Sequence, residues 1–204
     1  MGAGAGRVAA HIAPLVSGVT VCDGSPAMSE GLRQAAASVP NLEALPITPW
    51  PLPEPVGAAD VVFSSHVVYF VRDIAPFLDA FEAHAWRRCI VAAGDRAGAS
   101  PPPDLFEAVH GEPYEELPAL DELVQALATR GARYEVRRVP GGAALGSAQV
   151  GTDPMLLYRR RCHVQKGTPA DARLREALAA RDQDEIANWS PFTSMAVVSW
   201  EPGA

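Results

Sequence analysis

The residues best suited to chemistry lie near the start of the chain, where three glycines precede an acidic residue. Gly2, Gly4 and Gly6 stand directly before a predicted helix, and Asp23 ends the next apolar run, 21 positions after Gly2. Glycine lets a ligand approach the backbone closely, and the free N–H groups of a helix N-terminus attract an anionic group. A carboxylate one strand further on can accept hydrogen bonds from both hydroxyls of a ribose. These residues therefore predict a site for a ligand that resembles a nucleotide.

The elements that must position these residues alternate between buried strands and amphipathic helices. Strands are predicted over 18–22, 60–63, 89–93 and 196–200, and helices over 7–16, 25–39, 73–86 and 121–130. This alternation is typical of an α/β fold with a doubly wound, mostly parallel sheet and helices on both faces. Ligands of such sheets bind at the carboxyl ends of the strands, which places the loops after Asp23, Ile47, His66 and Ala93 at the functional edge.

Several motifs, taken in order, resemble those of the class I S-adenosylmethionine-dependent methyltransferases. Gly2–Gly6 is similar to the G-x-G-x-G loop of that family, and residues 19–28 resemble its second strand, ribose-binding acid and Ser-x-x-Met turn. Residues 59–71 are similar to its fourth strand and the start of the next helix. The last strand, with Trp200, suits the antiparallel final strand of the family. The resemblance implies a Rossmann-like fold, S-adenosylmethionine as cofactor and methyl transfer to an oxygen or nitrogen of a small molecule.

The resemblance also implies roles for individual residues. It assigns the amino-acid end of the cofactor to Gly2, Gly4 and Gly6, the ribose to Asp23, and the adenine to Met28 and Trp50. Gly24 and Ser64 complete the predicted cofactor-binding set, and no metal is expected.

A proton acceptor for the methyl transfer is sought at the same edge. His66, just after the strand predicted over 60–63, which resembles the fourth strand of the family, is the best-placed base. Tyr69 is a weaker candidate. The alternative for His66 is a role in lining the pocket without moving a proton.

Two departures from the family pattern stand out. The strand that should precede Gly2 is absent, so we expect an N-terminally truncated sheet and a natural product that starts upstream of Met1. The stretch from Pro46 to Trp50 lacks the acid that often contacts the adenine amine.

Composition limits the partners of the chain. A net charge of -7 and a pI near 5.2 argue against a nucleic-acid partner. Three widely spaced cysteines lack metal-ligand spacing and indicate reduced thiols in the cytoplasm. Neither a signal peptide nor a membrane-spanning segment is predicted. The expected partner is a small-molecule substrate, and the oligomeric state is left open.

We expect residues 1–204 to form a single domain in which 151–191 is a helical, lid-like insertion before the last strand. Substrate choice is expected there and in a loop over 101–118. Two alternatives to an active methyltransferase remain. The missing strand and missing acid favour a non-catalytic or decayed binding protein. An NAD(P)-dependent oxidoreductase is the other, although its G-x-G-x-x-G loop would need a glycine where this chain has Arg7.

Overall fold

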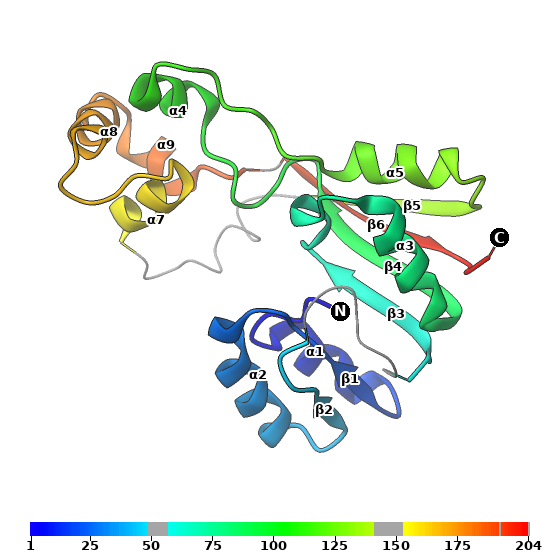
Figure 1. The fold of residues 1–204 in the computed structure, drawn as a ribbon. Coiled ribbons are helices and arrows are strands. Elements are labelled where there is room, and N and C mark those ends of the chain that lie inside the picture. The colour runs from blue at the N-terminus through cyan, green and yellow to red at the C-terminus, as the bar shows by residue number, and fades with distance from the viewer. Residues whose placement is uncertain (49–56, 141–152, 192, 204) are drawn as a thin grey trace. The chain divides into compact units, whose positions relative to one another are not determined.

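The computed structural model describes residues 1–48, 57–140, 153–191 and 193–203, which fold into two compact units (Figure 1). The first, which we call the sheet unit, comprises Met1–Ala92, Val124–Val136 and Val198–Ala204. The second, the helical unit, comprises Ala93–Leu123 and Arg137–Val197. The chain therefore passes between the units several times.

Helices, 3-10 turns (η) and strands alternate along the chain. In chain order they are α1 (Arg7–Ile12), η1 (Ala13–Leu15), β1 (Val19–Val21), α2 (Pro26–Ser38), β2 (Leu42–Ala44), β3 (Ala59–Ser65), η2 (Val68–Phe70), α3 (Ile74–Ala83), β4 (Ala85–Gly94), α4 (Pro103–His110), α5 (Leu120–Thr129), β5 (Tyr134–Pro140), α7 (Pro154–Arg161), α8 (Pro169–Ala179), α9 (Gln183–Asn188) and β6 (Ser194–Trp200).

The strands of the described residues form two sheets. β1 pairs with β2 in parallel, with Val19 opposite Leu42, and a second sheet has the order β3-β4-β6-β5. β3 and β4 are also parallel, with Val62 opposite Cys89. This mixed, Rossmann-like arrangement with an antiparallel C-terminal strand confirms the predicted fold class. The carboxyl ends of β1 and β3 supply the residues of the site described below.

The N-terminal part of the sheet unit is held by a small apolar core and by close contact between α1 and α2. Val21, Leu32 and Leu42 are buried in this core. A Cβ atom at Gly6 would lie 2.8 Å from the Cβ of Ala35 on α2, a distance that no real side chain tolerates. A glycine before α1 is therefore needed for helix packing.

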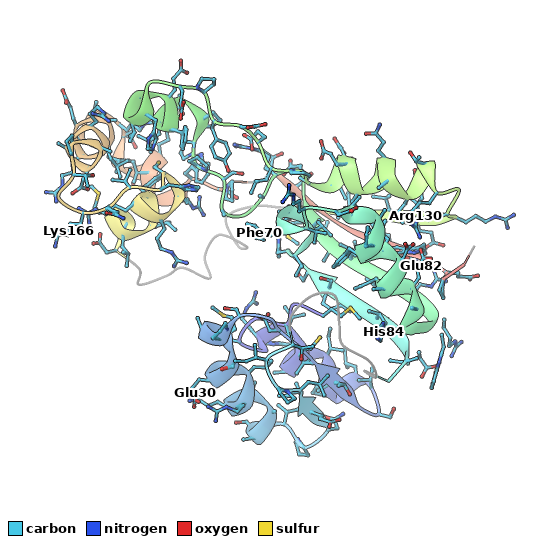
Figure 2. All side chains as sticks on the ribbon, viewed as in Figure 1. Glu30, Phe70, Glu82, His84, Arg130 and Lys166 are labelled. Carbon is cyan, nitrogen blue, oxygen red and sulfur yellow. The ribbon has the colours of Figure 1, made fainter. Side chains whose placement is uncertain are left out.

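A second core in the sheet unit joins α3 to the last strand. The rings of Phe77, Phe81 and Trp200 are stacked, with centroids 5.4 and 5.9 Å apart along the series. Trp200 also donates its indole N–H to Glu82 over 2.8 Å, so its one polar group is satisfied in the core. Arg130, directly after α5, lies 3.7 Å from Glu82, and both are labelled in Figure 2.

The helical unit has its own core between α4, α7 and α8. Its buried residues are Leu105, Val109, Tyr158, Cys162, Val164, Leu174 and Leu178. Asp171 on α8 ties α7 to α8, because it accepts hydrogen bonds from Arg159 over 2.8 and 3.2 Å.

Two expected elements differ in the structure. The helix expected to run to Trp86 ends at Ala83, and Trp86 belongs to β4. Its amphipathic stripe ended at Ala85, where the strand begins, so helix and strand could not be separated by pattern. The segment 101–118, expected to be a loop, contains α4, which begins at Pro103 because proline suits the first turn of a helix.

No helix among the described residues has the length and apolar character needed to cross a membrane.

Candidate functional site

The sheet unit contains a cavity of about 670 Å³ at the carboxyl ends of β1 and β3. This volume lies within the range of pockets for small molecules and cofactors. Its lining residues come from the N-terminal glycine segment, the loops after β1, β2 and β3, and the start of α3. They are Met1, Gly2, Gly4, Cys22, Asp23, Gly24, Thr48, Ser65, His66, Val67, Phe70, Val71, Arg72, Asp73, Pro76 and Phe77.

The glycine segment forms one wall of the cavity as a turn with left-handed backbone angles. The φ angles are +65° at Gly2, +56° at Gly4 and +82° at Gly6. A Cβ atom at Gly2 would lie 2.3 Å from Cγ2 of Val67, whereas a Cβ atom at Gly4 would meet nothing within 4 Å. Gly2 is therefore required by close packing, and Gly4 leaves open space at the cavity wall.

Backbone hydrogen bonds hold this turn between the two sheets. The amino group of Met1 donates to the carbonyl of Phe63 on β3 over 2.8 Å. The N–H of Ala3 donates to the carbonyl of Cys22, directly after β1, over 3.1 Å. The turn is thereby placed beside the carboxyl ends of both strands.

Asp23 lies directly beneath the turn and organises it. Its two carboxylate oxygens accept hydrogen bonds from the N–H of Gly4 over 2.7 Å and from the N–H of Ser25 over 2.8 Å. Each carboxylate oxygen has a second lone pair, so both can still accept a hydrogen bond from a ligand hydroxyl. The acid thus shapes the turn and faces the same cavity.

His66 also lines the cavity and follows the last residue of β3. Its N–H donates to the carbonyl of Ala92, which extends the β3–β4 pairing by one residue, and its φ of +59° then turns the chain into η2. The Nδ1 atom lies 3.0 Å from the hydroxyl of Tyr69. Burial lowers the pKa of His66 below its usual 6.5, and the positive charge of Arg7 lowers it further. The imidazole is therefore neutral at physiological pH.

The structure brings some of the predicted site residues together and separates others. Gly2, Gly4, Asp23, Gly24 and His66 line the cavity. The remaining members of the predicted set that the structure describes are outside its lining, namely Gly6, Met28, Ser64 and Tyr69. Trp50 lies outside the described residues.

The four residues outside the lining differ in their contacts and exposure. Gly6 packs against α2, as described above. Met28 lies on α2 with 39% of its surface exposed, and Ser64 is buried in β3 with no hydrogen-bond partner for its hydroxyl among the described residues. Tyr69 is buried, and its hydroxyl lies against Nδ1 of His66, which lines the cavity.

Sequence reasoning missed the cavity wall formed after β2 and β3. Thr48 is buried there, and its N–H donates to the carbonyl of Asp23 over 3.1 Å. Phe70 of η2, which is labelled in Figure 2, lines the cavity. Its surface is 65% exposed. An apolar aromatic residue in the turn after a site-bearing strand was the available signal for this wall.

Metal-binding residues do not gather in the described part of the chain. No group of three or more histidine, cysteine, aspartate or glutamate side chains lies close enough there to hold a metal ion.

The residues that line this cavity all fall within the segment that matches a known family model. Residues 1–84 match the family described as a methyltransferase domain. They contain the glycine turn, Asp23 and His66. No curated protein matches the sequence.

Solved structures extend the comparison to the whole chain. The YcgJ protein of Bacillus subtilis is 13% identical, with a TM-score of 0.60 over 100% of this chain and 90% of that one. The N-methyltransferase NodS of Bradyrhizobium japonicum, solved with S-adenosylhomocysteine, is 12% identical, with a TM-score of 0.55 over 100% and 76% of the two chains.

A third similar structure is the phosphoethanolamine N-methyltransferase 2 of Haemonchus contortus, in complex with phosphomonomethylethanolamine and S-adenosylhomocysteine. It is 16% identical, with a TM-score of 0.55 over 98% of this chain and 47% of that one. Residues 1–84 thus match the methyltransferase-domain family, and the chain as a whole has the fold of these solved structures.

Proposed function

We propose that this protein transfers a methyl group from S-adenosylmethionine to an oxygen or nitrogen of a small molecule, with the cavity of the sheet unit as its cofactor site. The observation that carries the proposal is that one cavity is lined by the glycine turn, Asp23 and His66 together. Two of the similar structures are N-methyltransferases, which supports nitrogen as one of these acceptors.

The residues present fit the cofactor in size and in chemistry. A side chain at Gly4 would protrude into open space at the cavity wall. With glycine there, a ligand can approach the peptide groups of the protein backbone closely. The second lone pairs of Asp23 suit the two hydroxyls of a ribose. The bound sulfonium would supply an already activated methyl group, so the chain's own task is alignment and exclusion of water.

We propose His66 as the proton acceptor for the nucleophile and Tyr69 as its positioning residue. Because burial lowers the pKa of His66, the imidazole is deprotonated at neutral pH and can take a proton from a hydroxyl or ammonium group. The hydroxyl of Tyr69, 3.0 Å from Nδ1, limits rotation of the ring. Tyr69 is buried, so it would hold His66 and not touch the substrate.

The location that we propose is the cytoplasm. Its support is that Cys22, Cys89 and Cys162 are all free and buried, as expected of thiols kept reduced.

Calorimetric titration with S-adenosylhomocysteine tests the cofactor site. We expect the wild-type chain to bind and Asp23→Ala to bind about 10- to 100-fold more weakly, because it loses charge-assisted hydrogen bonds. The matched control is Asp60→Ala, an exposed acid of β3 that faces Arg87, and its affinity should be unchanged. Equal affinity in wild type and Asp23→Ala would remove Asp23 from the site.

Activity is tested by incubating the protein with S-adenosylmethionine and a pool of small hydroxyl- and amine-containing compounds. Methylated products should gain the mass of one methylene group and appear together with S-adenosylhomocysteine. Cofactor binding without any methylated product would favour the binding-protein alternative.

A further inference from the structure

The helical unit contains a buried arginine that the proposed function does not use. Arg161 is the last residue of α7, whose ribbon is labelled in Figure 1. Only 6% of the surface of Arg161 is exposed. Its guanidinium carbon lies 4.5 Å from the centroid of the Trp189 ring. A guanidinium stacked on indole keeps its N–H edge available for a partner in the same plane.

No carboxylate in the described residues neutralises this guanidinium. The other buried or half-buried arginines around it are paired, since Arg159 meets Asp171 and Arg181 meets Asp104. Arg161 has no ion pair or hydrogen bond within the described residues, and its Nη1 atom is fully buried there without a partner.

The undescribed stretch of the helical unit offers no counter-charge either. Residues 141–152 contain neither aspartate nor glutamate. Within the described part of the chain, this positive charge is thus buried against the face of Trp189 without an ion pair. Burial of a charged group is costly unless it is paired, and burial here lowers the pKa of Arg161.

We propose that Arg161, backed by Trp189, anchors a binding site in the helical unit for a small molecule that carries a carboxylate. A planar carboxylate can accept two parallel hydrogen bonds from the edge of a guanidinium. One unpaired positive charge matches a carboxylate of charge −1, whereas a phosphate ester carries nearly −2 and would need a second free cation. This inference does not depend on the proposed methyl transfer.

Nη1 is fully buried without a partner among the described residues, and 6% of the surface of the whole residue stays exposed. After a small rotation of the guanidinium, a carboxylate that enters from the exposed part would accept its second hydrogen bond from Nη1.

The test compares the melting temperature of the full chain in sodium propionate with that in sodium chloride at equal ionic strength. The variants are Arg161→Met and, as a matched control, Arg160→Met, which changes the exposed neighbour on the same helix. We expect propionate to raise the melting temperature of wild type and of Arg160→Met equally, with no rise in Arg161→Met. An equal rise in all three proteins, or none in wild type, would overturn the proposal.

Two further measurements separate ligand binding from a purely structural role. Without propionate, Arg161→Met should melt at or above the temperature of the wild type, because an unpaired buried charge is removed. A melting temperature below that of Arg160→Met would make Arg161 a structural residue and contradict the proposal. In the ¹H–¹⁵N spectrum, propionate should shift the indole signal of Trp189, assigned by Trp189→Phe, at least tenfold more steeply in wild type than in Arg161→Met.

Phosphate is the competing anion. After subtraction of the effect on Arg161→Met, propionate should stabilise the wild type more than phosphate does at equal ionic strength. A larger specific effect of phosphate would overturn the assignment to a carboxylate.

Discussion

Gly2 and Gly4 have similar backbone angles but different reasons to be glycine. At Gly2 the space for a Cβ is already filled by Val67, whereas at Gly4 that space belongs to the cavity. The same substitution should therefore damage stability at one position and ligand binding at the other.

We expect Gly2→Ala to lower the free energy of unfolding by about 2 kcal/mol or more, because strain at positive φ adds to a clash. Gly4→Ala should cost about 1 kcal/mol of backbone strain and should weaken S-adenosylhomocysteine binding more than it weakens the fold. Urea unfolding and calorimetry measure the two quantities. Val67→Ala should restore part of the stability of Gly2→Ala and none of the affinity of Gly4→Ala; the reverse pattern would contradict this assignment.

The pKa of His66 predicts the pH dependence of methyl transfer. Because the pKa lies below 6.5 in the folded protein, the base is neutral at pH 7, and kcat should decline only as the pH falls below that value. Arg7→Gln removes a positive charge that lowers this pKa, so the declining limb should move to higher pH. The measurement is the pH profile of kcat with an acceptor found in the screen.

His66→Gln should lower kcat about 10²- to 10⁴-fold, the usual contribution of a general base, and should abolish that limb. A profile that keeps the same limb in His66→Gln would exclude His66 as the titrating base.

Residues at strand ends were predictable from the sequence, and residues behind them were not. Asp23 and His66 were found because a buried apolar run ends at each, and parallel strands place such ends at one edge. Ser64 precedes His66 by two positions, yet it is buried in β3 and outside the cavity lining. The backbone turns sharply at His66, where φ is positive. This turn decides which residues next to His66 line the cavity, and the sequence pattern does not show it.

At the scale of elements, Asp171 is the residue that joins α7 to α8. It accepts hydrogen bonds from Arg159, from the N–H of Gly167 over 2.9 Å and from Arg175 over 3.2 Å. These partners favour the carboxylate form, led by the side chain of Arg159, and hold the pKa of Asp171 far below its usual 3.8.

We therefore expect Asp171→Asn to lower the melting temperature of the helical unit, because Arg159 is left half-buried without its partner. Since the folded pKa is depressed, the stabilisation is present above the unfolded value of 3.8 and is lost as the pH falls through and below it. Acid unfolding followed by circular dichroism should thus be shallower in Asp171→Asn. The control is Glu176→Gln on the exposed face of α8, which should behave as wild type.

Element boundaries were predictable where a capping residue or a proline marks them. They were not predictable where a helix is followed directly by a strand with similar apolar residues. α2 begins at Pro26, as the preceding serine and the proline indicate. The junction of α3 and β4 has no glycine or proline, and its apolar residues fit both a helix face and a buried strand. Tertiary pairing of Ala59 with Ala85 decides that the strand begins there.

At the scale of the whole molecule, the reactivity of two cysteines can follow the unfolding of each unit separately. Cys89 lies in β4 of the sheet unit and Cys162 follows α7 in the helical unit, and both are fully buried. Burial raises the pKa of Cys89 to about 12 and that of Cys162 to about 11.

Neither of these two thiols should react with iodoacetamide in the native protein at pH 8, because the thiolate is absent and the sulfur is covered. With rising urea, Cys162 should become reactive before Cys89, since Cys89 lies on an inner strand between β3 and β6, where local opening is rarest. Mass spectrometry of the labelled peptides measures both reactions. Simultaneous labelling would show that the two units unfold together.

The position of β6 has a consequence for how the protein is made. β6 is the last strand of the part of the chain that the structure describes, yet it lies between β4 and β5 (Figure 1). During synthesis from the N-terminus, β4 and β5 leave the ribosome without the neighbour that separates them. The nascent chain must therefore keep two strand edges apart until residue 200 has emerged, and premature pairing of β4 with β5 is the misfolding hazard built into this order of strands.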